Sequence, residues 1–320
     1  MELDQYLKIN GNNMKIVLMT ILLTACSGIK LQDTEPVAEV TAEPTKVSVV
    51  YSQQTITVQN GKAKYINFQT PQEDGSYALD CTEQNSPKPL KQKIPYIVKS
   101  NVGVTYYAES YFSRAKKHFC YSEGQLVLEV NVSRFPYKKE HLKVSKKKID
   151  LSKKDLARVI RERKITSAIY KKSVPYLLFD KPFIVPLDSF ITSHYGNQRI
   201  FNNKKRSQHL GNDFRAKVGV EIPSSNRGKV VFVGDLFYTG NVVIIDHGLN
   251  LFSLYAHLSK ILVTEGTILN QGDIVGLSGM TGRVSGPHLH WGIKMNGHNI
   301  DGFSLAEESK KHFKSYESSL

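Results

Sequence analysis

Short runs rich in β-branched and aromatic residues follow one another along most of the chain, separated by glycine, proline and asparagine. Such runs are typical of β-strands, because these side chains pack well on a pleated surface. In residues 46–145 they predict a small β-sandwich-like domain. Residues 183–304 predict a glycine-rich domain built on an antiparallel β-sheet. We therefore expect a mainly β fold, with strands at 47–51, 55–58, 65–68, 102–107 and 126–132 in the first domain and at 229–233, 242–246, 251–256 and 288–294 in the second.

The segment between these two regions has a different pattern. Leu156, Val159 and Ile160 recur at helical spacing between charged residues, which predicts an amphipathic helix over 152–172. This helix would form most of a basic linker, 146–182, and the prolines that follow from Pro175 onward would end it. Residues 305–320 would then form a C-terminal tail.

The amino-terminal region has the pattern of a targeting signal. The apolar run 16–23 follows Lys15 and is too short to span a bilayer, which needs about 20 residues. It ends in Leu23-Thr24-Ala25-Cys26, which resembles the lipobox of bacterial lipoproteins, so residues 1–26 are the expected signal peptide and Cys26 the expected site of lipidation. The alternative is a chance cysteine after an ordinary apolar segment. Acidic residues near Met1 are unusual ahead of a signal and favour a start at Met14.

Residues 27–45 are rich in Thr, Glu, Pro and Ala without apolar periodicity, and predict a flexible tether. If Cys26 carries lipid, Cys81 and Cys120 remain. In an exported protein two such cysteines indicate one disulfide, and two unpaired buried thiols are the alternative.

The net charge of +14 is concentrated in residues 134–172, which hold fifteen Lys or Arg against four acidic residues. A basic band of this kind can bind nucleic acid, anionic lipid or an anionic polymer such as the cell wall. A solvated charged face explains most of these lysines equally well. Aromatic residues are not interleaved with the Lys and Arg as single-stranded nucleic acid would require, so we expect no nucleic-acid partner.

Histidine and aspartate recur at spacings that suit a metal site. In an extended backbone, residues two or four apart point to the same face, so His209 can converge with Asp213, and His288 with His290. The same period would place the phenol of Tyr255 beside His257. Imidazole nitrogen and carboxylate oxygen suit zinc, and a catalytic zinc keeps three protein ligands and one open position.

Together these motifs resemble the lysostaphin-type zinc endopeptidases of the M23 family. The chain has their His-x-x-x-Asp, then a His before Leu, then a His-x-His, in order and with compatible spacing. The resemblance covers roughly residues 183–303. Its flanking pattern is also present: Ser193-His194-Tyr195-Gly196 with Arg199, Tyr238-Thr239-Gly240-Asn241, Ile245-Asp246-His247-Gly248, Thr281-Gly282 and Ser285-Gly286-Pro287.

The resemblance implies a function and a role for each residue. His209, Asp213 and His290 would bind one zinc ion per chain. His257 and His288 would act as general base and transition-state stabiliser, although His257 could instead orient a ligand. Tyr238 matches a position near the developing oxyanion. The implied reaction is hydrolysis of peptide cross-links or bridges in bacterial peptidoglycan.

The remaining histidines receive no chemical role. His247 is expected at a hairpin corner as a structural residue, where Asp and Gly supply the turn. His194 would edge the cleft or simply lie on the surface. The isolated histidines, which have no partner at ligand spacing, are His118, His141, His298 and His312.

A second interpretation is a non-catalytic binding protein on the same fold that activates a cell-wall amidase. Members of that kind have generally lost zinc ligands, whereas this chain keeps all three. The expected partners are peptidoglycan and, through lipid on Cys26, a membrane facing the wall, with Ser27 favouring the outer membrane of a cell that has one. No regulatory protein is identifiable from the sequence.

Overall fold

The computed structural model describes residues 50–84, 92–142, 151–202 and 205–317. The expected signal peptide, Cys26 and the tether lie outside these residues. The described chain is mainly β, as predicted, with two helices. None of the described helices combines the length and the apolar character that crossing a membrane demands.

The first sheet is continuous and has the strand order β1-β7-β6-β3-β4-β5-β2. Side chains from every one of its strands meet in a single buried cluster, so the sheet curves round its own core. Cys81 and Cys120 lie opposite each other on β3 and β6 and form a disulfide inside this core. The strands are β1 (Gln54–Gln59), β2 (Ala63–Gln69), β3 (Gly75–Glu83), β4 (Gln92–Lys99), β5 (Val102–Ala108), β6 (Lys116–Ser122) and β7 (Gln125–Ser133).

The sequence pattern identified four of these strands and missed β3, β4 and β6. Each missed strand carries charged or polar residues on its exposed positions, and β4 contains Pro95, so none reads as a β-branched run. The strand predicted at 47–51 lies partly outside the described residues, and its described residues, Val50 and Tyr51, lie in no strand.

The second sheet has the order β17-β14-β15-β16-β19-β12-β9, with β18 paired to β16 and β13, and β20 paired to β19. Its central strands are buried on both faces, which explains the unbroken apolar run Val242–Ile245: Val243 and Ile245 face one core and Val242 and Ile244 another. The strands are β9 (Ile191–Ser193), β12 (Asn212–Arg215), β13 (Glu221–Pro223), β14 (Gly228–Leu236), β15 (Gly240–Asp246), β16 (Leu251–Ile261), β17 (Ile268–Leu269), β18 (Ile274–Ser278), β19 (His288–Met295) and β20 (His298–Ile300).

A small third sheet connects the two regions. Its strand β8 (Lys139–Leu142) pairs in parallel with β10 (Gln198–Phe201), which in turn pairs with β11 (Lys205–Gln208). Since β11 ends one residue before His209, this sheet leads directly into the first metal-binding motif.

The predicted linker helix is confirmed as α1 (Lys153–Ile169), and Ser152 caps it by accepting a hydrogen bond from the Asp155 backbone N–H. The expected packing face was wrong. Leu156 and Ile160 are each 49% exposed, and no residue of α1 is buried. The helix instead contacts β14 through Arg158, which binds Asp235, and its Glu162 accepts a hydrogen bond from the Phe237 backbone N–H just after that strand.

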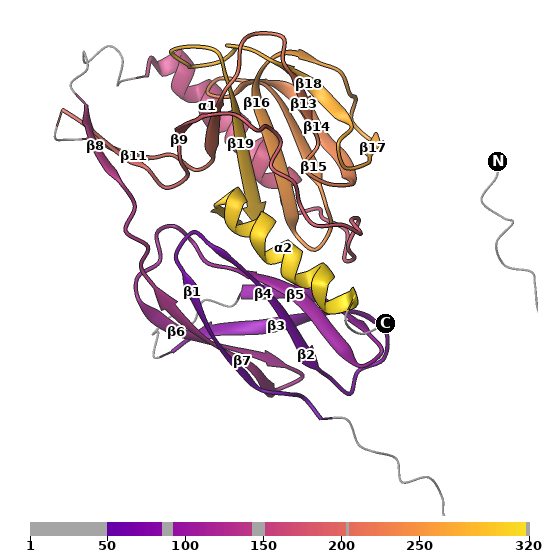
Figure 1. Ribbon diagram of the computed structural model, residues 1–320. Helices are drawn as coiled ribbons and strands as arrows, with labels where there is room; N and C mark the ends of the chain where they lie inside the picture. Colours follow the sequence, from indigo (N-terminus) through magenta and orange to yellow (C-terminus); the bar gives the residue numbers. More distant parts are fainter. Residues whose placement is uncertain (1–49, 85–91, 143–150, 203–204, 318–320) are drawn as a thin grey trace, which may run out of the picture. The chain divides into compact units, whose positions relative to one another are not determined.

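The predicted C-terminal tail is instead mostly a helix, α2 (Gly302–Glu317), drawn in yellow in Figure 1. It packs against β2: Ser304 accepts a hydrogen bond from the Ala63 backbone and Glu308 accepts one from the Tyr65 backbone. The helix was missed because its apolar residues are few and its partner strand is remote in sequence.

One buried cluster joins the first sheet to the second. Ala63, Tyr106 and Ala108 pack in the same core as Trp291 and Leu305. The two predicted domains therefore share a hydrophobic core instead of being joined by a linker alone.

Candidate metal centre

Strand β12 is the base of the site. Its Asp213 lies opposite His290 on β19 and opposite Ser193 on β9, so the antiparallel register brings the aspartate and one histidine together. His209 precedes β12, and the chain bends at Gly211 before the strand begins. The expectation of one extended segment from His209 to Asp213 was wrong, although the two side chains do meet.

Gly211 allows this bend. A Cβ atom there would lie 2.5 Å from Cε1 of His290 and 2.7 Å from the Trp291 carbonyl oxygen. Any larger residue would therefore push against a ligand of the site. The glycine at the centre of the His-x-x-x-Asp motif is required by space alone, because its φ is not positive.

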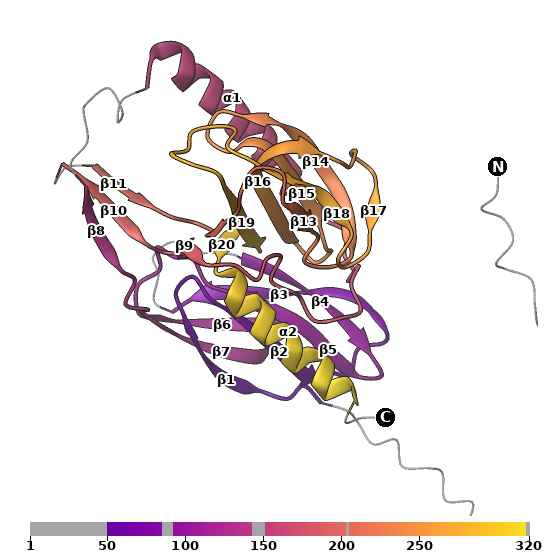
Figure 2. The same cartoon turned by 45° about the horizontal axis from the view of Figure 1, so that its top comes forward.

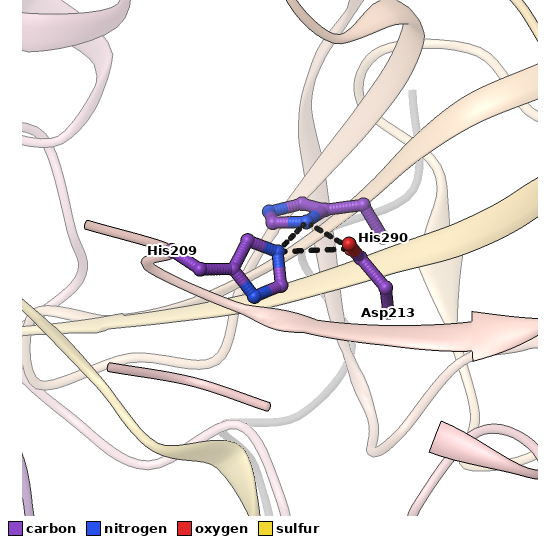
Figure 3. Close-up of side chains that lie close together, drawn as sticks. All are labelled: His209, Asp213 and His290. Carbon is purple, nitrogen blue, oxygen red and sulfur yellow. Dashed lines mark hydrogen bonds and ion pairs between the residues drawn. The ribbon is translucent and has the colours of Figure 1, made fainter. Parts of the chain in front are cut away.

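Figure 3 shows His209, Asp213 and His290 pointing toward one another. Nε2 of His209 lies 3.0 Å from Oδ1 of Asp213 and 3.1 Å from Nδ1 of His290, and the last two atoms are 2.8 Å apart. In a tetrahedral zinc site, three ligand atoms that each lie at the usual distance from the ion are roughly 3.3 Å from one another. The three side chains therefore fit a zinc ion with little movement.

The electrostatics of Asp213 agree with a cation site. Burial alone would raise the pKa of this carboxyl group, but the adjacent imidazoles of His209 and His290 outweigh burial and hold the pKa far below its ordinary value. The carboxylate is thus ionised at any physiological pH. Among the described residues, these three form the cluster of His, Cys, Asp and Glu close enough to share a metal ion.

The ring of His209 is oriented by contacts of the nitrogen that faces away from the cluster. Its Nδ1 lies 3.0 Å from the His194 carbonyl oxygen and 3.2 Å from Oγ of Ser193. Because a carbonyl oxygen can only accept, Nδ1 carries the proton and Nε2 faces the site with a lone pair. His194 thus contributes through its backbone, while its side chain is exposed.

His257 and His288 lie beside this cluster. Their ring centroids are 4.7 Å apart, and the His257 ring is 5.9 Å from that of His290. Nδ1 of His257 donates to the Thr281 carbonyl oxygen at 2.9 Å, and Nδ1 of His288 donates to that of Gly286 at 2.8 Å. In both rings this leaves Nε2 as the nitrogen without the proton, and Nε2 of His288 lies 3.7 Å from Oδ1 of Asp213.

Burial, together with the neighbouring His290 and His288, lowers the pKa of His257 to about 4, although the hydrogen bond to the Thr281 carbonyl and the nearby Asp213 carboxylate act in the opposite direction. Burial also lowers the pKa of His290. The imidazole of His257 is therefore neutral near pH 7, the form that can accept a proton.

His257 has φ of 64°, a left-handed conformation that is uncommon for a residue other than glycine. The left-handed turn ends the regular alternation of β16 and places His257 against the turn at Thr281. For this reason Tyr255 does not join the site as the period of two predicted. Its hydroxyl accepts a hydrogen bond from the Ser225 backbone N–H at 2.7 Å instead.

Tyr238 is 46% exposed on the turn before β15, and within residues 205–317 no hydrogen bond joins its phenol to the three-residue cluster. Two residues that support the site, Thr281 and Ser193, were not predicted to have a role. Both lie in the motifs that flank the histidines, and this position is the sequence feature that could have identified them.

The other histidines lie away from the site. His247 is fully buried at the expected turn, with Nδ1 2.8 Å from the Arg227 carbonyl oxygen and Nε2 2.8 Å from Oγ of Ser253. His118 and His312 are also buried, and His298 is half-buried. His141 lies exposed on β8.

Comparison with known proteins places the similarity in the second sheet. The sequence profile of peptidase family M23 matches residues 207–302. The peptidoglycan DD-endopeptidase ShyA of Vibrio cholerae is 40% identical over 119 residues, which are 36% of this chain and 28% of that protein. The DD-carboxypeptidase/endopeptidase Mpg of Neisseria meningitidis is 38% identical over 98 residues, 31% of this chain and 23% of that protein. The chain thus spans about a quarter of the length of these relatives.

A solved structure from Pseudomonas aeruginosa, assigned to peptidase M23, covers 78% of this chain and 95% of its own, with a TM-score of 0.55 and 23% sequence identity. This likeness extends well beyond the matched residues 207–302 and supports the fold of the chain.

Proposed function

We propose that this chain, whose residues 207–302 form a peptidase family M23 domain, is a zinc-dependent endopeptidase that hydrolyses peptide cross-links or bridges of bacterial peptidoglycan. The observation that carries the proposal is the convergence of His209, Asp213 and His290, with two further imidazoles beside them. The activity named for the similar Vibrio and Neisseria proteins supports the same reaction class.

His209, Asp213 and His290 would hold one zinc ion per chain. Zinc bound by three protein ligands supplies Lewis acidity, which lowers the pKa of water and polarises a carbonyl group. The donor set of two neutral imidazoles and one carboxylate suits zinc better than magnesium or calcium, which prefer oxygen ligands alone.

His257 and His288 supply the proton-transfer groups. In each ring the hydrogen bond from Nδ1 to a backbone carbonyl fixes the tautomer and leaves Nε2 free to accept a proton. His257 is neutral near pH 7 and is therefore suited to the general base, while His288 would need a proton on Nε2 as well to stabilise the negative charge that develops on the peptide carbonyl oxygen. Tyr238 is 46% exposed, and its role near the developing oxyanion stays a prediction.

The rival function is a non-catalytic protein of the same fold that activates a cell-wall amidase. The complete set of three ligands argues for the enzyme. The motif ending in Cys26 supports a further proposal, that the chain is an exported lipoprotein anchored in a membrane facing the wall.

The test uses residues 47–320, which form one compact unit. With zinc supplied, this protein should release new amine ends from purified peptidoglycan, and mass analysis of the fragments should name the bond. A chelator should abolish release, as should His290→Ala, while His194→Ala, which changes an exposed side chain, should retain it. Undiminished cleavage by the His290→Ala protein would falsify the proposed metal site.

A further inference from the structure

Helix α1 presents its apolar side chains outward. Leu156 and Ile160 are one turn apart on the same face, and each is 49% exposed. An apolar pair directed at solvent on a helix that packs through its polar side reverses the usual arrangement of a surface helix.

The orientation of α1 is fixed by specific contacts. Arg158 binds the Asp235 carboxylate, with Nη2 2.9 Å from Oδ2, and Glu162 accepts a hydrogen bond from the Phe237 backbone N–H at 2.9 Å. At the carboxyl end of the helix, the ring of Tyr170 packs edge-on against Phe252. Figures 1 and 2 show α1 beside the second sheet in both views. The outward face of α1 is therefore held away from the protein.

Cations surround the apolar pair. Lys153 lies three residues before Leu156, and Arg163 and Lys164 lie three and four residues after Ile160, so all three project from the same side of the helix. Unlike Arg158, they form no ion pair with any carboxylate in the part of the chain that the structure describes. The same holds for four further exposed cations of this segment: Lys154, Arg161, Lys171 and Lys172.

We propose that this face of α1 binds the surface of an anionic phospholipid bilayer. The cations would contact lipid phosphates, and Leu156 and Ile160 would enter between the headgroups. A bilayer satisfies both features of the face. A soluble or wall-bound polyanion would use the cations alone and leave the apolar pair in water.

This proposal does not rest on the peptidase activity, because the binding face contains no residue of the metal centre. Asp235 and Phe237 connect α1 to the turn at residues 237–239, which leads into β15. Membrane contact through α1 would therefore fix the orientation of the peptidase sheet relative to the bilayer.

The test is co-sedimentation of residues 47–320 with vesicles of phosphatidylcholine alone and of phosphatidylcholine mixed with phosphatidylglycerol. Binding should require the anionic lipid. The combined variant Lys153→Glu, Arg163→Glu and Lys164→Glu should weaken binding at least about tenfold. The combined variant Leu156→Ser and Ile160→Ser should also weaken it while keeping every charge. Circular dichroism and peptidoglycan cleavage would report that each variant is folded.

The matched control is Lys99→Glu, Lys217→Glu and Lys260→Glu, which changes the net charge equally at exposed lysines outside α1. This control should bind nearly as well as the unchanged protein. Equal loss in the control and the α1 variant would overturn the proposal, since net charge alone would then explain binding. So would full binding by the Leu156→Ser and Ile160→Ser protein, or retention by peptidoglycan sacculi with no affinity for anionic vesicles.

Discussion

Nζ of Lys62 lies 2.6 Å from Oδ2 of Asp301, across 239 residues of sequence. The same carboxylate accepts hydrogen bonds through Oδ1 from Asn212 and from the Phe303 backbone N–H, both at 3.2 Å. Asp301 thus joins the first sheet to the strand that carries Asp213, and it caps the start of α2.

Replacing Asp301 by Ala should lower the free energy of unfolding by about 2–4 kcal/mol, because the cap is lost and Lys62 is left partly buried without its partner. Urea denaturation of residues 47–320 measures the change. Lys310→Ala is the control, since it removes an exposed pair with Glu307 and should cost less than about 1 kcal/mol. Similar losses in the two variants would show that the Lys62 and Asp301 pair stabilises the protein no more than an exposed ion pair does.

Gly211→Ala should weaken zinc binding by about 10- to 100-fold, because the added methyl group would collide with the His290 ring. Isothermal titration with zinc measures the affinity, and circular dichroism checks the fold. Gly286→Ala is a matched control, since a Cβ atom there meets nothing within 4 Å. Unchanged affinity in Gly211→Ala would mean that the site can shift without loss of its ligand geometry.

Thr281→Val should lower kcat by about 10- to 100-fold with little change in zinc affinity. The Thr281 hydroxyl donates to the Leu258 carbonyl oxygen and accepts from the Asn241 backbone N–H, so it holds the turn whose carbonyl orients His257. Thr281→Ser keeps both hydrogen bonds and should keep most of the activity. Loss of zinc affinity and kcat together would point to general disruption of the sheet.

Acidification should destabilise the protein between about pH 6.5 and pH 4 through His312. Burial lowers the pKa of this ring from 6.5 to about 4, so over that range the unfolded chain binds a proton that the folded chain excludes. Stability is therefore complete above pH 6.5 and falls as the pH drops, by up to about 3 kcal/mol. Urea midpoints measured across this range should fall less steeply for His312→Gln than for the unchanged protein. His194→Gln, at an exposed histidine, should leave the slope as it was.

The sequence predicted the metal cluster more fully than the structure around it. The spacing of two within His288-Leu289-His290 survives on β19, where Leu289 is buried and both histidines face the site. The predicted position of Tyr255 beside His257 was wrong, because the left-handed backbone of His257 interrupts the alternation of side chains along β16. No local sequence pattern predicts such a backbone conformation at a histidine. The contacts of Asp301 with Lys62 and Asn212 could not be predicted either, because they join residues that are remote in sequence.

In the fold, strands with consecutive apolar residues were predictable, whereas strands with polar exposed faces were not. Helix α1 was predicted from a spacing of apolar residues that turned out to face solvent. The prediction succeeded because helical periodicity does not depend on which face packs. Helix α2 escaped detection because the core in which its Leu305 and Ala306 pack is shared with strands that are remote in sequence.

Helix α2 follows every described strand along the chain, yet it packs in the same core as Ala63 and Tyr106 of the early strands β2 and β5. Before α2 is made, the first sheet therefore exposes an apolar patch to water. A chain stopped near residue 300 would keep every metal ligand and still leave that patch in water.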